Sequence, residues 1–361
     1  MGLPPTKQKG TTLQKKVTAD IRRMEEPAAM SGKATTTRNN VARGAILGAL
    51  IGDAAGGTLE FLGRTPTPHE VDKAMQLVGG GIFDLAPGQF TDDGEMTVTL
   101  LRALNANSAV YHGDQVALAY FSWANSDPFD IGNATSQALA YPMSGGVNYR
   151  SISSQAIATN SESKANGSLM RAAPLGILGA KLSLDDTIKL AYKDAALTHP
   201  NQACLASTAA YVIALRHLLL QPFDSFGAIN AAETYLAQEC PEVMSWLQDA
   251  KAGLLPEAEP LIGYVRIAFT HAFFHLYQST SYESALKTTL AMGGDTDTNA
   301  CIVGGLVGAH LGYDQLPGHL IRTVTKCDTA KGQHRPRVYS SENIVREIDD
   351  LVEHVTTALA H

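Results

Sequence analysis

The chain has 361 residues, of which 45% are hydrophobic and 17% charged, and this balance supports a large buried core rather than a coiled coil, a collagen or a disordered chain. The net charge of −7 argues against a general nucleic-acid-binding protein, which would be basic. No run approaches the roughly 20 apolar residues that cross a bilayer, the N-terminus lacks the apolar core of a signal peptide, and the four cysteines have no paired spacing, so we expect a cytoplasmic protein without membrane contact or disulfides.

The N-terminal extension, residues 1–40, differs from the rest of the chain. It holds eight basic and three acidic side chains, so residues 41–361 carry a net charge of −12. Its abundance of Pro, Thr, Gly and Lys is typical of a segment without a core of its own. Four apolar residues share one helical face: Leu13, Val17, Ile21 and Met24. We expect a short amphipathic helix that either folds back on the body or binds an acidic partner.

From about Val41 onward the apolar spacing is helical and strand patterns are almost absent, which predicts one all-α domain over residues 41–361. Glycines recur at every fourth residue within Arg43–Gly57 and again within Ile302–Gly312, which predicts two helices with closely packed backbones. The other predicted helices are Glu95–Asn105, Gly113–Ser126, Leu184–Thr198, Gln202–Leu220, Phe226–Gln238, Ile262–Gln278, Ser281–Met292 and Ser341–Leu359. We expect loops at Gly79–Phe90, Asp127–Gly132 and Tyr141–Gly167.

An acidic residue follows the first glycine-rich helix. Glu60 lies in an apolar, glycine-containing turn, where burial would raise its pKa and suit it to general acid or base catalysis. A solvated loop glutamate is the alternative interpretation. Asp53, within the same segment, is interpreted as a structural residue that bonds neighbouring backbone.

Two further acidic clusters each precede a predicted helix. The first contains Thr91, Asp92 and Asp93, and the second contains Asp295, Asp297 and Thr298 after a pair of glycines that lets the backbone bend. A single cluster of this kind can simply cap a helix. Together the clusters offer four carboxylates and two hydroxyls, whose charges would repel if packed without a cation. We therefore predict Mg²⁺ or Mn²⁺, with room for two ions about 3.5–4 Å apart.

Four segments occur in the order and context of the ADP-ribosylglycohydrolase family, which the chain resembles from about Val41 to Gly312: Gly52–Glu60, Thr91–Asp93, Asn166–Arg171 and Gly293–Thr298. That family includes dinitrogenase-reductase-activating glycohydrolases and ADP-ribosylarginine hydrolases. The resemblance implies a single compact domain of orthogonally packed helices around a binuclear magnesium or manganese centre. The metal ligands that it implies are Thr91, Asp92, Asp93, Asp295, Asp297 and Thr298.

The same resemblance assigns roles to other residues. Glu60 matches the family's catalytic or water-positioning glutamate, and Asp130 is similar to a residue that lies at the substrate ribose. The substrate-binding residues implied in this way are Asn166, Gly167, Ser168, His199, Gly293 and Gly294. The chain departs from the family pattern at Gly94, where many members have threonine, and at Ala165, where glycine is common.

The implied function is a metal-dependent hydrolase that removes ADP-ribose from modified protein side chains, and Asp130 favours arginine as the acceptor. One hypothesis for residues 1–40 is that they bind and block an ADP-ribosyltransferase toxin, which would make the chain an immunity protein (antitoxin). Two alternatives stay open. They are a catalytically silent ADP-ribose-binding or scaffold protein, and a magnesium-dependent phosphatase.

Overall fold

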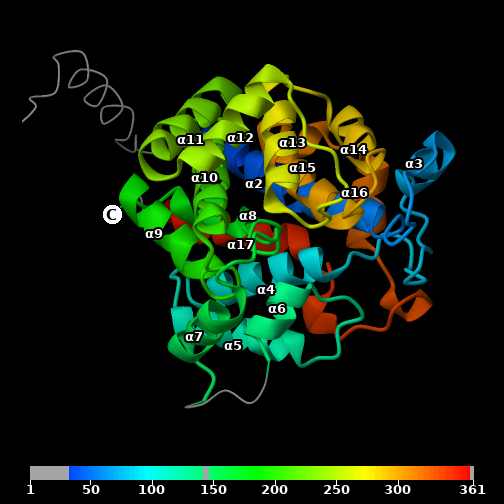
Figure 1. Cartoon of the computed structure of the whole chain (residues 1–361), viewed down its shortest axis with the longest axis horizontal. Helices are drawn as coiled ribbons and strands as arrows, with labels where there is room; N and C mark the ends of the chain where they lie inside the picture. Colours follow the sequence, from blue (N-terminus) through cyan, green and yellow to red (C-terminus); the bar gives the residue numbers. More distant parts are fainter. Residues whose placement is uncertain (1–31, 141–145, 358–361) are drawn as a thin grey trace, which may run out of the picture.

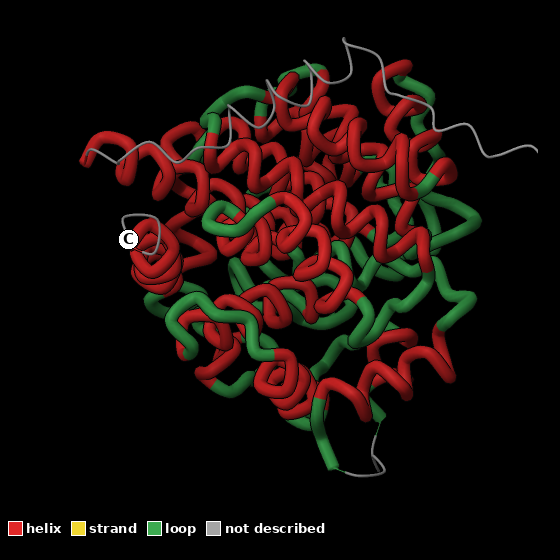
Figure 2. Tube along the Cα trace, turned by 90° about the vertical axis from the view of Figure 1, so that its left-hand side faces the viewer, coloured by secondary structure: helices red, strands yellow, loops and turns green. Residues whose placement is uncertain are grey.

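The computed structural model describes residues 32–140 and 146–357, and within these ranges the chain forms helices and loops with no β-strand (Figure 2). The predicted all-α class is therefore confirmed. The α-helices are α2 (Gly32–Gly56), α3 (Pro68–Ala74), α4 (Asp92–Ala106), α5 (Gly113–Ala124), α6 (Asn133–Ala138), α7 (Tyr149–Asn160), α8 (Ala173–Gly179), α9 (Leu184–Ala195), α10 (Gln202–Leu220), α11 (Ser225–Glu239), α12 (Pro241–Ala252), α13 (Val265–Tyr277), α14 (Tyr282–Leu290), α15 (Thr296–Leu311), α16 (Gly318–Thr325) and α17 (Ile344–Thr357). Three short 3₁₀ turns lie at Tyr313–Gln315, Thr329–Lys331 and Arg337–Tyr339.

Helices α2 and α15 form the centre of the fold (Figure 1). A side chain added at Gly48 would place its first carbon 2.3 Å from the carbonyl oxygen of Gly304, and one added at Gly44 would lie 2.1 Å from that of Gly308. The two glycine stripes therefore allow backbone contact, as their spacing predicts. The partners run in opposite directions, since Gly56 meets Thr296 at the other end of the pair. The C-terminal end of α2 thus lies against the N-terminal end of α15.

The remaining helices cover this pair on two sides. Helices α10 to α14 lie on one side, and α4 to α7 lie on the other (Figure 1). Helix α17 packs against both α2 and α4 and closes the body near the C-terminus. One continuous apolar core includes the side chains of Ile46, Leu100 and Phe269. A single domain is the outcome.

Several predicted boundaries shift. Helix α10 matches its predicted range, whereas α2 begins at Gly32, well before the expected start at Arg43. Arg38 already donates a hydrogen bond to the carbonyl oxygen of Leu219, so part of the extension is built into the body. The helix expected around Leu13–Met24 lies outside the described residues.

The prediction of a loop over Tyr141–Gly167 is wrong in part, because α7 occupies Tyr149–Asn160. Asn148 and Ser151 begin this helix with reciprocal side-chain to backbone hydrogen bonds, a capping box. Helix α12 was also missed, although Pro241 at its first position is a common helix-start signal.

Helix α10 is the exception to the expectation that no segment is long and apolar enough to cross a membrane. By length and composition α10 is apolar enough to cross a membrane, but 83% of its apolar window is buried inside the protein. Most of its Ala, Val and Leu side chains belong to the continuous core. The core position of α10 accounts for its composition.

Candidate active site

The antiparallel contact between α2 and α15 brings the acidic segments together. The hydroxyl oxygen of Thr296, the first residue of α15, lies 2.9 Å from the carbonyl oxygen of Gly56 at the end of α2. The turn before α15 is made by Gly293 and Gly294, whose φ angles of 72° and 70° lie in the left-handed region that favours glycine. The two helix ends and this turn position the carboxylates described below.

Asp53, on the last turns of α2, holds the start of α4. Its Oδ1 accepts hydrogen bonds from the amide and the hydroxyl of Thr91, both at 2.8 Å, and its Oδ2 accepts one of 2.6 Å from the amide of Gly94. These amides are among those that a helix start leaves unpaired, so Asp53 caps α4 from another helix. The interpretation of Asp53 as a residue that bonds backbone is confirmed, but the backbone that it bonds is distant in sequence.

Glu60 does the same for α15. Its Oε1 accepts hydrogen bonds from the amides of Thr296 and Asp297 and a 2.6 Å hydrogen bond from the Thr296 hydroxyl. The side chain is buried rather than solvated, as the catalytic interpretation requires. A segment that follows α2 therefore orients the first turn of α15 through a negative charge at the positive end of that helix.

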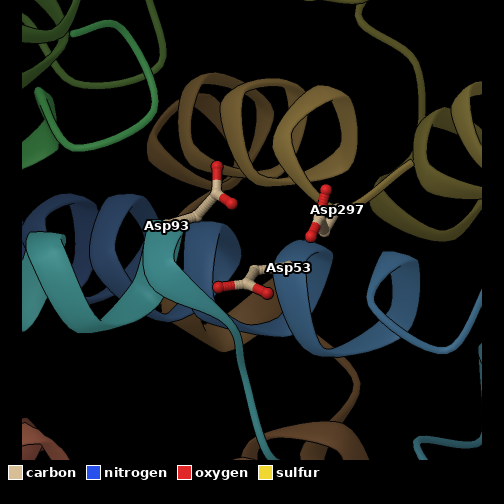
Figure 3. A group of neighbouring side chains, drawn as sticks. All are labelled: Asp53, Asp93 and Asp297. Carbon is tan, nitrogen blue, oxygen red and sulfur yellow. The ribbon is translucent and has the colours of Figure 1, made fainter. Parts of the chain in front are cut away.

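The acidic side chains form three overlapping groups, in each of which carboxylate oxygens lie within 4.8 Å of one another. The groups are Asp53, Asp93 and Asp297; Glu60, Asp295 and Asp297; and Asp92, Asp130 and Asp297. Figure 3 shows the first group, with the three carboxylates around one space between α2, α4 and α15. Asp297 belongs to every group and lies at their centre. The structure thus unites the two predicted clusters and adds Asp53, Glu60 and Asp130 to them.

The cluster lacks enough protons to satisfy its oxygens. Thr91 Oγ1 lies 2.8 Å from Asp53 Oδ1, 3.3 Å from Asp93 Oδ2 and 3.1 Å from Asp297 Oδ2, yet a hydroxyl has only one proton to donate. Asp93 Oδ1 is buried and has no hydrogen-bond partner. Buried oxygens in this state favour a cation among them. The donor set is all oxygen, which fits a hard divalent ion.

Burial and mutual repulsion raise the pKa of these carboxyl groups. Burial, opposed by the hydrogen bonds from Thr91, raises the pKa of Asp53 to about 7. Burial and the neighbouring Asp295 raise the pKa of Glu60 to about 7. Burial, followed by the other carboxylates, raises the pKa of the deepest groups well above the ordinary value; these are Asp92, Asp93 and Asp297. Each shift measures how strongly the protein alone disfavours the ionised form.

Asp130 and Asn166 lie at the edge of the cluster. Burial raises the pKa of Asp130 to about 6, and its carboxylate joins those of Asp92 and Asp297. Asn166 donates a 2.7 Å hydrogen bond to Asp295 Oδ2. Thr298 adds a second hydroxyl beside that of Thr91, with its Oγ1 at 3.3 Å from Asp93 Oδ2.

The other residues expected to contact substrate are held in the interior. Ser168 is fully buried and its hydroxyl pairs with that of Thr208. His199 packs against Gly167, and its Nδ1 pairs with the Thr198 hydroxyl. Burial and the nearby Arg171 lower the pKa of His199 to about 3, so its ring is neutral at physiological pH. In this arrangement Ser168 and His199 shape the loop from within.

A buried ion pair that the sequence analysis missed supports the same region. Arg335 donates hydrogen bonds of 2.8 and 2.9 Å to Glu95, which lies one helical turn after Asp92. It also donates to the carbonyl oxygens of Ser126 and Asp127. Trp123 donates a further 2.7 Å hydrogen bond to Glu95. The C-terminal segment thereby joins α4 to the loop that leads to Asp130. The partners are 240 positions apart in the sequence, so no local sequence signal indicates this pair.

Comparison with known proteins agrees with the family resemblance of the sequence. Residues 34–357 match the ADP-ribosylglycohydrolase family. A relative from Acanthamoeba polyphaga mimivirus, named provisionally as an ADP-ribosyl glycohydrolase, is 32% identical over 82% of this chain and 94% of its own length. An ADP-ribosylarginine hydrolase from Pseudomonas putida is 28% identical, with 78% of this chain and 74% of the relative covered. A solved structure described as an ADP-ribosylglycohydrolase-related protein complex superposes with a TM-score of 0.67 at 25% identity, over 90% of this chain and all of the other.

Proposed function

Because the chain belongs to the ADP-ribosylglycohydrolase family, we propose that it is a divalent-metal-dependent hydrolase that releases ADP-ribose from arginine side chains of modified proteins. The observation that carries this proposal is the buried carboxylate cluster centred on Asp297, with the unpaired oxygen of Asp93 inside it. Such a cluster is costly for folding and is suited to holding cations.

The oxygen ligands for two Mg²⁺ ions, or Mn²⁺ in their place, would come from Thr91, Asp92, Asp93, Asp295, Asp297 and Thr298, with Asp53 beside them. When bound, such ions lower the pKa of a coordinated water and fix ribose hydroxyls near it. The donor set supports this assignment because it contains only carboxylate and hydroxyl oxygens, which magnesium and manganese prefer.

In the proposed reaction a water oxygen bonds to ribose C1, the bond from C1 to the guanidine nitrogen breaks, and that nitrogen takes up a proton. Such a reaction passes through an oxocarbenium-like state. Glu60 accepts the proton of the attacking water. The hydrogen bond that Glu60 accepts from the start of α15 fixes the direction of its carboxylate. Asp130 supplies or relays the proton for the leaving guanidine, for which its pKa of about 6 is suited. The loop at Asn166–Gly167 faces the ADP-ribose portion in this proposal.

Charge supports arginine as the acceptor. The three carboxylate groups comprise seven different acidic side chains, and two divalent ions neutralise four negative charges. The excess negative charge attracts a cationic guanidine derivative more strongly than a neutral serine hydroxyl. The name of the Pseudomonas putida relative agrees with this assignment.

The direct experiment measures release of ADP-ribose from an arginine-modified and a serine-modified protein, with Mg²⁺ and with chelator. We expect release from the arginine substrate with metal only. The Asp297→Asn variant should lose this activity, and Glu283→Gln, at an exposed glutamate on α14, should keep it. Binding of ADP-ribose without release would favour the scaffold alternative, and release of phosphate would favour the phosphatase.

The hypothesis of a transferase-blocking extension needs a truncation that spares the body. Since α2 begins at Gly32 and Arg38 bonds Leu219, deletion of residues 1–31 is the appropriate variant. Hydrolysis should persist in it while binding to a cognate transferase is lost. Unchanged binding would remove the hypothesis.

A further inference from the structure

Three phenylalanines form a row at the surface, here named the aromatic rim: Phe61, Phe83 and Phe129. The ring centres of Phe61 and Phe83 lie 5.8 Å apart, and those of Phe83 and Phe129 lie 5.4 Å apart, both with edge-to-face geometry. Phe61 is 69% exposed and the other two are half-buried. The three rings come from three separate loops, so tertiary structure rather than local sequence assembles the row.

The aromatic rim adjoins the acidic cluster at both of its ends. Phe61 directly follows Glu60, and Phe129 directly precedes Asp130. Neighbouring Cα atoms are about 3.8 Å apart, so each outer phenylalanine starts within one residue of a carboxylate that approaches Asp297. The row therefore runs along the edge of the candidate active site from one proposed proton-transfer residue to the other.

The backbone at Phe61 is in an unfavourable conformation. Its φ of 56° lies in the left-handed region, which is unfavourable for a residue with a Cβ. The same loop exposes most of an apolar ring to water. Two local costs at one residue beside the site are typical of a position retained for binding rather than for stability.

The chemistry of this edge suits a cation with a flat apolar surface. Aromatic faces attract guanidinium groups, and a guanidinium stacks on them better than an ammonium does. The carboxylate cluster beside the row adds negative charge, which would repel a phosphate and gives a neutral apolar ligand no advantage. We propose that the aromatic rim binds the acceptor arginine, so that its guanidinium packs against the rings of this row while C1 of the ribose lies over the carboxylate cluster. This inference rests on the proposed function and names the residues that select its acceptor.

The test compares variants that keep apolar volume but remove the aromatic face. Phe61→Leu and Phe129→Leu should each raise KM for an ADP-ribosylarginine peptide about fivefold, the effect of one cation–π contact at an exposed site, with kcat little changed. Phe61→Trp, which keeps an aromatic face, should have the low KM of the wild type. The control is Phe226→Leu on α11, where an equally exposed ring, at 63%, contacts Tyr277 away from the rim. An unchanged KM in both leucine variants would overturn the proposal, and so would an equal rise for an ADP-ribosylserine peptide.

A second measurement separates this inference from the proposed function. In the metal-loaded Phe61→Trp protein, arginine methyl ester should change the indole fluorescence with saturation, and the neutral analogue citrulline methyl ester should not. Absence of hydrolysis with a saturable arginine signal would contradict the proposed function alone. Hydrolysis without any difference between arginine and citrulline would contradict the aromatic rim alone.

Discussion

Glu60 and Asp297 are joined through a backbone hydrogen bond: Glu60 Oε1 accepts the amide of Asp297 at 3.2 Å. The residue proposed to handle the proton of the water thus also fixes the helix turn that carries the central carboxylate. A change at Glu60 acts on chemistry and on local structure together. The two effects separate when the charge and the capping oxygen are removed one at a time.

Glu60→Gln keeps an oxygen that can cap α15 but removes the negative charge, whereas Glu60→Ala removes both. We expect each variant to lose hydrolysis by about 10²–10⁴-fold, the range for a missing general base. Only the alanine variant should also lose about 1 kcal/mol of stability, the value of a helix cap, and melt roughly 2–4 °C lower. Rates and melting curves check this prediction. A glutamine variant with the wild-type rate would remove Glu60 from the mechanism.

Metal binding should stabilise the fold by relieving repulsion among Asp92, Asp93 and Asp297. With Mn²⁺ at 100 times its dissociation constant, the free energy of unfolding should rise by about 2.7 kcal/mol for each ion bound. In Asp297→Asn the metal-free protein should be at least as stable as the wild type, because one repelling charge is gone, while the gain from metal shrinks. Thermal melting with Mn²⁺ and with chelator gives both numbers. An equal gain in the two proteins would place the ion elsewhere.

The pKa values of Asp53 and Glu60, both raised to about 7, predict an unusual pH dependence for the metal-free protein. Carboxyl groups of the unfolded chain have pKa values of about 4. Between about pH 4 and about pH 7 the folded state therefore binds more protons than the unfolded state. The free energy of unfolding must then fall as pH rises from about 4 to about 7. Urea titrations at several pH values test this. Saturating Mn²⁺ should abolish the fall, and persistence of the same slope with metal would count against shared sites.

Arg335 and Glu95 should be strongly coupled, since both are nearly fully buried. Arg335→Met leaves Glu95 buried without its cationic partner and should cost about 3–5 kcal/mol, whereas the double variant Glu95→Leu with Arg335→Met should cost less than Arg335→Met alone. The neighbouring exposed pair of Arg337 and Glu342 is the control, and Arg337→Met should cost less than about 1 kcal/mol. A double-mutant cycle by urea denaturation measures the coupling. Additive effects would contradict it.

How far sequence predicts this molecule is clearest at its glycines and acids. The four-residue glycine spacing predicted a close helix pair, but the direction of α15 against α2, which places Thr296 at Gly56, comes from long-range packing. The sequence predicted that the clusters around Asp93 and Asp297 need a cation if they pack together, because their charges repel. The structure brings these carboxylates together, and the cation remains the prediction.

Two long-range contacts had no signal in the local sequence. Arg335 reaches Glu95 only through the path of the C-terminal segment, and the hydroxyl of Ser168 faces Thr208 rather than a loop opening. By contrast, α7 and α12 were predictable from Asn148 and Pro241, whose capping signals outweigh the polar, loop-like composition around them.

The central claim, that the carboxylates at the starts of α4 and α15 share divalent ions, is tested most directly by anomalous diffraction from crystals grown with Mn²⁺. We predict two peaks about 3.5–4 Å apart, in contact with carboxylate oxygens of Asp92, Asp93 and Asp297. Fully occupied Mn²⁺ elsewhere in the crystal with no peak between those two helix starts would contradict the account.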